Sequence, residues 1–187
     1  MKSLNLHLAA SKDDLRPQMQ YIAIQSREKV VVTDANILIW GTFEDLFLLN
    51  DLDETINNLL DSGIYIHKDE YKKIANKDLL TISDVDQERK ELRFMDAKLN
   101  QYVVSYETDI NYMNWERVIP TSVEDLNSIT LNMELMNRLY SVCKPRDSKL
   151  CKFELQFHGQ TTAIKFEGAF DSTAGINAII MPMMRES

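Results

Sequence analysis

The sequence predicts an α+β fold in which short helices lie on antiparallel sheets. Three segments of alternating apolar residues recur at intervals of about 60 and 65 residues: "LNLH" from Leu4, "IYIH" from Ile64 and "ITLN" from Ile129. Each ends in a polar residue that can cap a helix, and strand-like segments follow each one. The repeat therefore predicts three half-units, each made of one helix on several antiparallel strands.

The first half-unit, residues 1–60, is expected to hold a short helix or none, because Pro17 follows "LAASKDDLR" closely. The stretch "MQYIAIQSREKVVVTDANILIW" predicts two strands around a polar turn at 26–29. Residues 43–63 are typical of a short helix or an ordered loop. His7, at the end of the first apolar segment, is expected to cap a helix.

The second half-unit, residues 61–120, predicts a helix after His67 and strands within 79–86, 90–98 and 100–108. The third, residues 121–187, predicts a helix after Asn132 and strands within 152–168 and 175–184. The best linker candidate is 120–128. We therefore expect a domain of two half-units over 1–120 and an additional half-unit over 121–187.

The composition favours a cytoplasmic protein with no membrane contact. The 187 residues carry a net charge of −8, and no apolar stretch approaches the ~18 residues that a membrane helix needs. The N-terminal segment lacks the apolar core of a signal peptide. Cys143 and Cys151 are expected to be thiols rather than a disulfide or a metal pair, so no cofactor is predicted.

Basic residues are concentrated in two places despite the acidic total. The window 136–152 carries +4, and its basic residues are Arg138, Lys144, Arg146, Lys149 and Lys152, against the single acid Asp147. Lys68 and Lys72 are four residues apart and share a helical face. Both groups are candidates for sequence-independent contact with DNA phosphates. The alternative is an ordinary solvated helix face. For Lys68 and Lys72 this alternative is supported nearly as well as DNA contact, because Asp69 and Glu70 are adjacent to them.

Asp34, in "KVVVTDANILIW", allows two interpretations. A strand that ends in Asp-x-Asn opens the metal-dependent nucleases of the PIN class, where the Asp is a metal ligand. Such a site needs further carboxylates on helices, whereas the candidates here fall in turns or linkers: Asp51, Asp53, Glu54, Asp84 and Asp86. A turn residue whose carboxylate bonds nearby backbone N–H groups is the favoured interpretation.

No nucleotide-binding or hydrolase motif is present. The chain contains no G-x-x-x-x-G-K, no G-x-G-x-x-G, no G-x-S-x-G and no H-E-x-x-H. The sequence therefore predicts a protein that is not an enzyme, with the PIN-like nuclease kept as the less favoured alternative.

Three longer segments resemble those of one family, the bacterial replicative sliding clamps (DNA polymerase III beta subunits). "RPQMQYIAIQSREKVVVTDANILIW" is similar to a stretch that leads into a Thr-Asp turn, "NYMNWERVIP" to a segment that closes a domain, and "AIIMPMM" to the C-terminal strand. They occur in the family's order and span most of the chain. The resemblance implies a DNA-clamp-like fold of tandem half-units, of which this chain holds three.

The resemblance also implies a function in DNA replication. A clamp tracks double-stranded DNA without sequence specificity and binds peptide motifs of polymerase or repair proteins, as a processivity factor does. A homo-oligomer is compatible with three half-units per chain. The alternative is a truncated relative that acts as a protein-interaction module and does not encircle DNA.

The matching positions of the family's peptide cleft come from its three motifs. They are Thr33, Asn36 and Leu38 at the turn, Pro120 at the domain-closing segment, and Ile179 and Met181 on the final strand. Asn36 stands where the family commonly has His. A flexible Met beside a Pro and branched aliphatic residues suits a soft peptide-binding surface. The alternative is that these residues are core.

Overall fold

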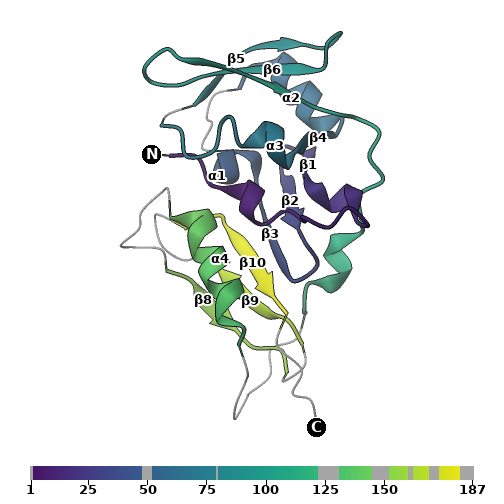
Figure 1. Cartoon of the computed structure of the whole chain (residues 1–187), viewed down its shortest axis with the longest axis vertical. Helices are drawn as coiled ribbons and strands as arrows, with labels where there is room; N and C mark the ends of the chain where they lie inside the picture. The colour runs from purple at the N-terminus through teal and green to yellow at the C-terminus, as the bar shows by residue number, and fades with distance from the viewer. Residues whose placement is uncertain are drawn as a thin grey trace.

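The structure, a computed structural model, describes residues 2–47, 52–78, 80–121, 131–144, 152–159, 162–168 and 173–181. In these residues a seven-stranded antiparallel sheet has the strand order β4-β1-β2-β3-β10-β9-β8, and a three-stranded sheet has the order β5-β6-β7 (Figure 1). The predicted α+β class with antiparallel sheets is confirmed. Figure 1 shows the three-stranded sheet at one end of the molecule and α4 across the strands of the third half-unit at the other.

The strands are β1 (Tyr21–Ser26), β2 (Lys29–Thr33), β3 (Ile37–Gly41), β4 (Ile64–His67), β5 (Thr81–Asp86), β6 (Glu91–Met95), β7 (Gln101–Ser105), β8 (Glu154–Gln156), β9 (Ile164–Glu167) and β10 (Asn177–Ile180). The α-helices are α1 (Phe43–Phe47), α2 (Glu54–Asp61), α3 (Lys68–Tyr71) and α4 (Met133–Cys143). The 3-10 helices are η1 (Leu6–Leu8), η2 (Pro17–Gln20) and η3 (Trp115–Val118).

In the first half-unit the predicted turn is present, but two predicted elements differ from those in the structure. The turn at 26–29 is confirmed, since Ser26 pairs with Lys29. The second predicted strand is two strands, β2 and β3, because the backbone reverses at 34–36, where Ala35 has a φ of +75°. The strand expected in "LNLH" is wrong: those residues lead into η1, held by a bond from the Asn5 amide to the Val142 carbonyl at 3.0 Å.

Two of the three predicted helix caps are confirmed. His67 caps α3 by accepting from the Asp69 amide, and Asn132 caps α4 by accepting from the Glu134 amide. His7 lies inside η1 and caps nothing, and its Nδ1 is buried without a hydrogen-bond partner among the described residues. Residues 43–63 hold two helices, of which α2 begins at the cap Asp53.

The strands predicted within 79–86, 90–98 and 100–108 are present as β5, β6 and β7, and those predicted within 152–168 and 175–184 as β8, β9 and β10. The segment "IYIH" forms β4, whereas "ITLN" forms no strand at 131–132, and 129–130 lie outside the described residues. Most of the linker candidate, residues 122–128, lies outside the described residues, as do Arg146, Lys149 and Cys151. No helix within the described part of the chain is long and apolar enough to span a bilayer.

Alternate residues of the seven-stranded sheet form two separate apolar clusters, because successive side chains of a strand point to opposite faces. On the helix-bearing face, the main core contains strand residues such as Ile24, Val32 and Ile39 together with residues of α1, α2, α3 and α4. The opposite face, called here the outer face, carries a second cluster: Ala23, Val31, Leu38, Trp115, Ala163 and Ile179, with Trp40, Tyr65, Tyr112, Met113 and Ile119 packed against it.

All three half-units contribute strands to the seven-stranded sheet, whereas the three-stranded sheet comes from the second half-unit alone. Strand β4 of the second half-unit pairs with β1 of the first, with Ala23 opposite Tyr65. Strand β10 of the third pairs with β3 of the first, with Leu38 opposite Ile179. The seven-stranded sheet thus runs across residue 120, and the division into 1–120 and 121–187 stays a prediction from the sequence.

Candidate functional site

The Asp34 carboxylate closes the β2–β3 turn. Its Oδ1 accepts hydrogen bonds from the Asn36 amide at 2.9 Å and the Ile37 amide at 3.0 Å. Its Oδ2 lies 2.7 Å from Nη1 of Arg138 on α4. The expected turn role is confirmed, and the ion pair also ties the third half-unit to the first. Both carboxylate oxygens of Asp34 therefore have protein partners.

Thr33 contributes to the same turn. Its hydroxyl donates to the Ile37 carbonyl at 2.8 Å and accepts from the Ala35 amide at 3.0 Å. The side chain is 1% exposed. Thr33 was expected to line a cleft, but the structure buries it and uses its hydroxyl to hold the backbone that presents Asn36.

Leu38 and Ile179 lie side by side on the outer face, at opposite positions of β3 and β10. Each is only 3% exposed and belongs to the outer-face cluster. The two residues are neighbours, as the pocket prediction requires, but they form a covered apolar floor rather than an open wall. That this floor belongs to a peptide site stays a prediction. The physical reason is the segment 112–119, which folds back across the sheet and packs against it.

Aromatic residues hold that covering segment in place. The Trp115 ring lies 6.0 Å from the Trp40 ring, and its indole N–H donates to Gln25 Oε1 at 3.0 Å. The Tyr112 ring lies 6.1 Å from that of Tyr65. Burial raises the pKa of the Tyr112 hydroxyl above its ordinary value, as expected for a phenol enclosed by apolar groups.

The edge of the outer-face cluster remains accessible at two apolar side chains. Met181 follows Ile179 on the same face by the alternation of the strand and is 41% exposed. Its amide donates to the carbonyl of the exposed Asn36 at 3.1 Å, so both residues lie at this edge. Val118 at the end of η3 is 44% exposed, and the following Ile119 packs on the cluster.

Val118 is a candidate that the sequence reasoning missed. Its signal in the sequence is an apolar residue inside "NYMNWERVIP", two positions before the predicted site residue Pro120. Pro120 itself is half-buried. Nothing in the local sequence distinguishes the residue that faces the cluster, Ile119, from the one that faces solvent.

Of the four predicted DNA-facing residues that the structure describes, three are engaged with other protein groups. The Lys68 ammonium donates to the Ser11 carbonyl at 2.7 Å. Lys72 forms an ion pair with Asp69, and this bond lowers the pKa of the Asp69 carboxyl. The charge of Lys72 is thus largely balanced by its own helix turn.

Among the predicted DNA-facing residues, the side chain of Arg138 is placed least as a phosphate contact would require. Its side chain is 28% exposed and pairs with Asp34 rather than extending into solvent. Nε and Nη2 are buried without hydrogen-bond partners among the described residues. Lys144, at the C-terminal cap of α4, is exposed and forms no ion pair with any described residue. Among the predicted DNA-facing residues that the structure describes, Lys144 is the one whose placement fits a contact with a DNA phosphate.

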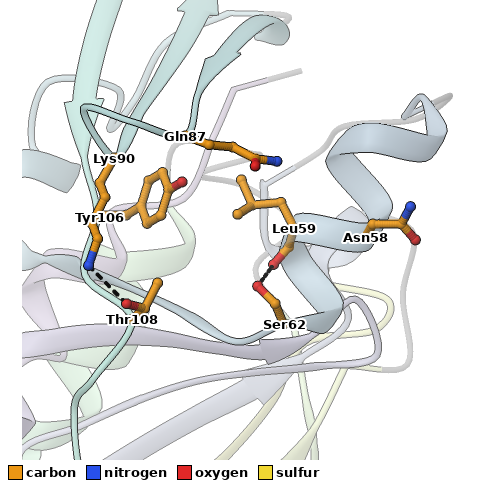
Figure 2. A pocket seen from close by; sticks show the side chains of 7 residues that line it. All are labelled: Asn58, Leu59, Ser62, Gln87, Lys90, Tyr106 and Thr108. Carbon is orange, nitrogen blue, oxygen red and sulfur yellow. Dashed lines mark hydrogen bonds between the residues drawn. The ribbon is translucent and has the colours of Figure 1, made fainter.

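A separate cavity of about 330 Å³ lies between α2 and the three-stranded sheet (Figure 2). Its lining residues are Asn58, Leu59, Ser62, Gln87, Lys90, Tyr106 and Thr108. Figure 2 shows the Lys90 ammonium turned to the Thr108 hydroxyl, which it reaches at 3.0 Å. This cavity is away from both predicted surfaces, and no sequence pattern pointed to it.

Comparisons with solved structures place the fold in the class of bacterial DNA sliding clamps. No protein-family model matches the chain, and no curated protein sequence matches it. The predicted resemblance is confirmed at the level of the fold, which is a mixed helical and antiparallel-sheet architecture of the clamp type.

The similar structures are beta subunits of DNA polymerase III. The chain from Streptococcus pneumoniae TIGR4 has a TM-score of 0.54 at 15% identity, over 96% of this chain and 60% of that one. The beta subunit from Streptococcus pyogenes has a TM-score of 0.56 at 11% identity, over 97% and 63%. The Helicobacter pylori clamp, solved with diflunisal, has a TM-score of 0.53 at 11% identity, over 97% and 62%. This chain thus spans about three fifths of the length of these clamps.

Proposed function

We propose that this chain is a non-enzymatic, clamp-like accessory protein of DNA replication that binds peptide segments of partner proteins at its outer face. The observation that supports this most directly is the convergence of Leu38 and Ile179 on one covered apolar floor, with Met181 and Val118 exposed beside it. An exposed Met next to a branched apolar residue can adapt to varied apolar anchors. Segments from the first and third half-units meet here through the β3–β10 pairing.

The test is peptide binding measured by fluorescence anisotropy. A labelled peptide with Leu and Phe anchors should bind, and Met181→Ala or Val118→Ala should weaken it about 3- to 10-fold, which corresponds to roughly 0.7–1.4 kcal/mol of lost apolar contact. Leu155→Ala is the matched control, because Leu155 on β8 is also 41% exposed and lies outside the outer-face cluster. Equal weakening by Leu155→Ala, or none by either test variant, would refute the assignment of the site.

The second part of the proposal is that the helix-bearing face contacts duplex DNA and tracks along it. The exposed Lys144 and the net charge of +4 in the sequence window 136–152 support this part. Binding to a labelled random duplex should fall steeply between 50 and 200 mM salt. Lys144→Ala should reduce the salt slope by about 1, whereas Lys12→Ala, an exposed lysine near the N-terminus, should not.

The alternative is an interaction module that does not track DNA. The pairing of Lys72 with Asp69 and of Arg138 with Asp34 favours it, because both cations are then neutralised on the face that would meet phosphates. Peptide binding without salt-dependent duplex binding would decide for this alternative. Solution mass with and without DNA would show whether copies of the chain assemble around the duplex.

A further inference from the structure

A pocket whose lining shares no residue with the outer-face cluster lies where η2 and the start of β1 meet the segment after β7. It has a volume of about 430 Å³. The residues that line this pocket, called here the junction pocket, are Pro17, Gln18, Tyr21, Asp109, Ile110 and Asn111. A cavity of this size falls within the range of pockets that bind small ligands or single side chains.

The junction pocket combines an apolar wall with an acidic rim. Pro17, Tyr21 and Ile110 supply rings and an aliphatic chain. Asp109 supplies one carboxylate, and Glu107 adjoins the pocket because its Oε1 accepts the Tyr21 hydroxyl at 2.8 Å. Burial, followed by this bond to Glu107, raises the pKa of Tyr21 to about 12, so the phenol keeps its proton and remains the donor.

The two carboxylates are held in place but not neutralised by the surrounding residues. Asp109 Oδ2 accepts from the Thr108 hydroxyl at 3.3 Å, and that hydroxyl in turn accepts from Lys90 (Figure 2). The backbone of Glu107 is fixed by two bonds to Tyr65, at 2.8 and 2.9 Å. Among the described residues, no Lys or Arg forms an ion pair with Glu107 or Asp109.

The basic groups near the pocket have other partners. Arg16, beside Pro17, lies 3.7 Å from Asp13. The His67 ring packs edge-on against Tyr21 at 5.2 Å and shares a hydrogen bond with Gln20. The pocket therefore presents the Asp109 carboxylate next to an aromatic ring and an aliphatic wall, and the Glu107 carboxylate adjoins it through the Tyr21 hydroxyl.

We propose that the junction pocket binds an arginine side chain from an exposed peptide segment of a partner protein. The guanidinium would pair with Glu107 and Asp109, while its methylene stem would lie on Pro17 and Ile110 with the Tyr21 ring beside it. Arginine fits better than lysine because its planar group can bond two carboxylates and stack on a ring at once. This inference is independent of the outer-face proposal, since the two sites share no residue.

The test is an NMR titration of the full chain with a capped Gly-Leu-Arg-Leu-Gly peptide. The backbone amide signals of 109–111 should shift on addition. The same peptide with citrulline, which is nearly isosteric with arginine and uncharged, should bind at least 10-fold more weakly. Asp109→Asn and Glu107→Gln should each weaken the arginine peptide about 3- to 10-fold, because either amide oxygen can still accept the existing hydroxyl bond.

Glu154→Gln is the matched control. It removes the same charge from an exposed position on β8, at the opposite end of the seven-stranded sheet from β4. Its binding should equal that of the wild type. Equal affinity for the citrulline peptide, shifts confined to other residues, or equal weakening by Glu154→Gln would overturn the proposal. Unchanged melting temperatures of the variants would show that a loss of binding does not reflect a loss of folding.

Discussion

The two faces of the seven-stranded sheet use the same strands in different ways. On the helix-bearing face, residues such as Ile24, Val32 and Ile39 are fully buried beneath four helices from all three half-units. On the outer face, Leu38 and Ile179 are covered by one folded-back segment, and the apolar surface continues into exposed side chains at its edge. The side chains of the first face are enclosed in the main core, whereas the second leaves apolar area exposed at its edge.

The largest expected effect on the free energy of unfolding comes from a comparison of one residue from each face. Ile39→Ala should lower the free energy of unfolding by about 2–5 kcal/mol, because it removes a fully buried aliphatic side chain and leaves a cavity. Met181→Ala should change it by less than about 0.5 kcal/mol, since that side chain is already largely in water. Urea unfolding measures both. Similar losses in the two variants would remove the distinction between the faces.

The next prediction concerns the contact between the first and third half-units. A Cβ on Gly175 would lie 2.0 Å from the Asp45 carboxyl, and the residue has a φ of +74°. Gly175→Ala should therefore cost about 2–4 kcal/mol from overpacking and backbone strain together. Gly63→Ala is the control, because its φ is +81° and its nearest atom is 3.9 Å away.

Gly63→Ala reports the backbone strain without the clash. Thermal or urea unfolding of the two variants should therefore show the larger loss for Gly175→Ala. Equal losses would mean that the approach of Gly175 to α1 does not hold the third half-unit against the first.

A smaller effect is expected at the ion pair that joins the β2–β3 turn to α4. Asp34→Ala should cost about 1.5–3 kcal/mol, because it removes two hydrogen bonds and one ion pair from one carboxylate and leaves Arg138 unpaired in a half-buried position. Asp84→Ala, whose partner Arg93 is 3.1 Å away at a more exposed site, should cost at most about 1 kcal/mol.

The same Asp34 variant tests the nuclease alternative. Mn²⁺-dependent DNA cleavage that disappears in Asp34→Ala without any change in unfolding free energy would contradict the turn role and favour a metal site. The structure supports the turn role, because both carboxylate oxygens already have partners in the protein.

The smallest effect lies away from both faces, in the β6–β7 hairpin. Hydrogen bonds from Asn100, with further bonds from Tyr102 and Lys98, lower the pKa of Asp96 from 3.8 to about 2. A carboxyl whose pKa is lower in the folded than in the unfolded state stabilises the folded state at pH values above its unfolded-state pKa. This contribution is lost as the pH falls from about 4 to about 2. Stability measured from pH 5 to pH 2 should therefore fall more for the wild type than for Asp96→Asn. Parallel curves would show that these bonds do not contribute.

For the two predicted surfaces, the sequence indicated which residues are neighbours but not which of them are buried or paired. The motifs that carry Leu38 and Ile179 resemble segments of one family, and the β3–β10 pairing does place these two residues together. Their burial could not be predicted, since it depends on the segment 112–119, which is distant in the chain from both residues. The ion pair of Arg138 could not be predicted for the same reason, because the charge of a sequence window does not reveal the distant carboxylate that meets it.

By itself the sequence determined the local elements of this protein: the alternating strands, the turn at Asp34 and the helix caps at His67 and Asn132. Each depends on residues only a few positions apart, so its pattern is visible in one short window. Only the tertiary structure decided that β4 joins β1, that β10 joins β3, that "LNLH" is not a strand, and which charges are neutralised. Those outcomes depend on packing and electrostatic contacts between distant segments, and such contacts leave no periodic trace in the chain.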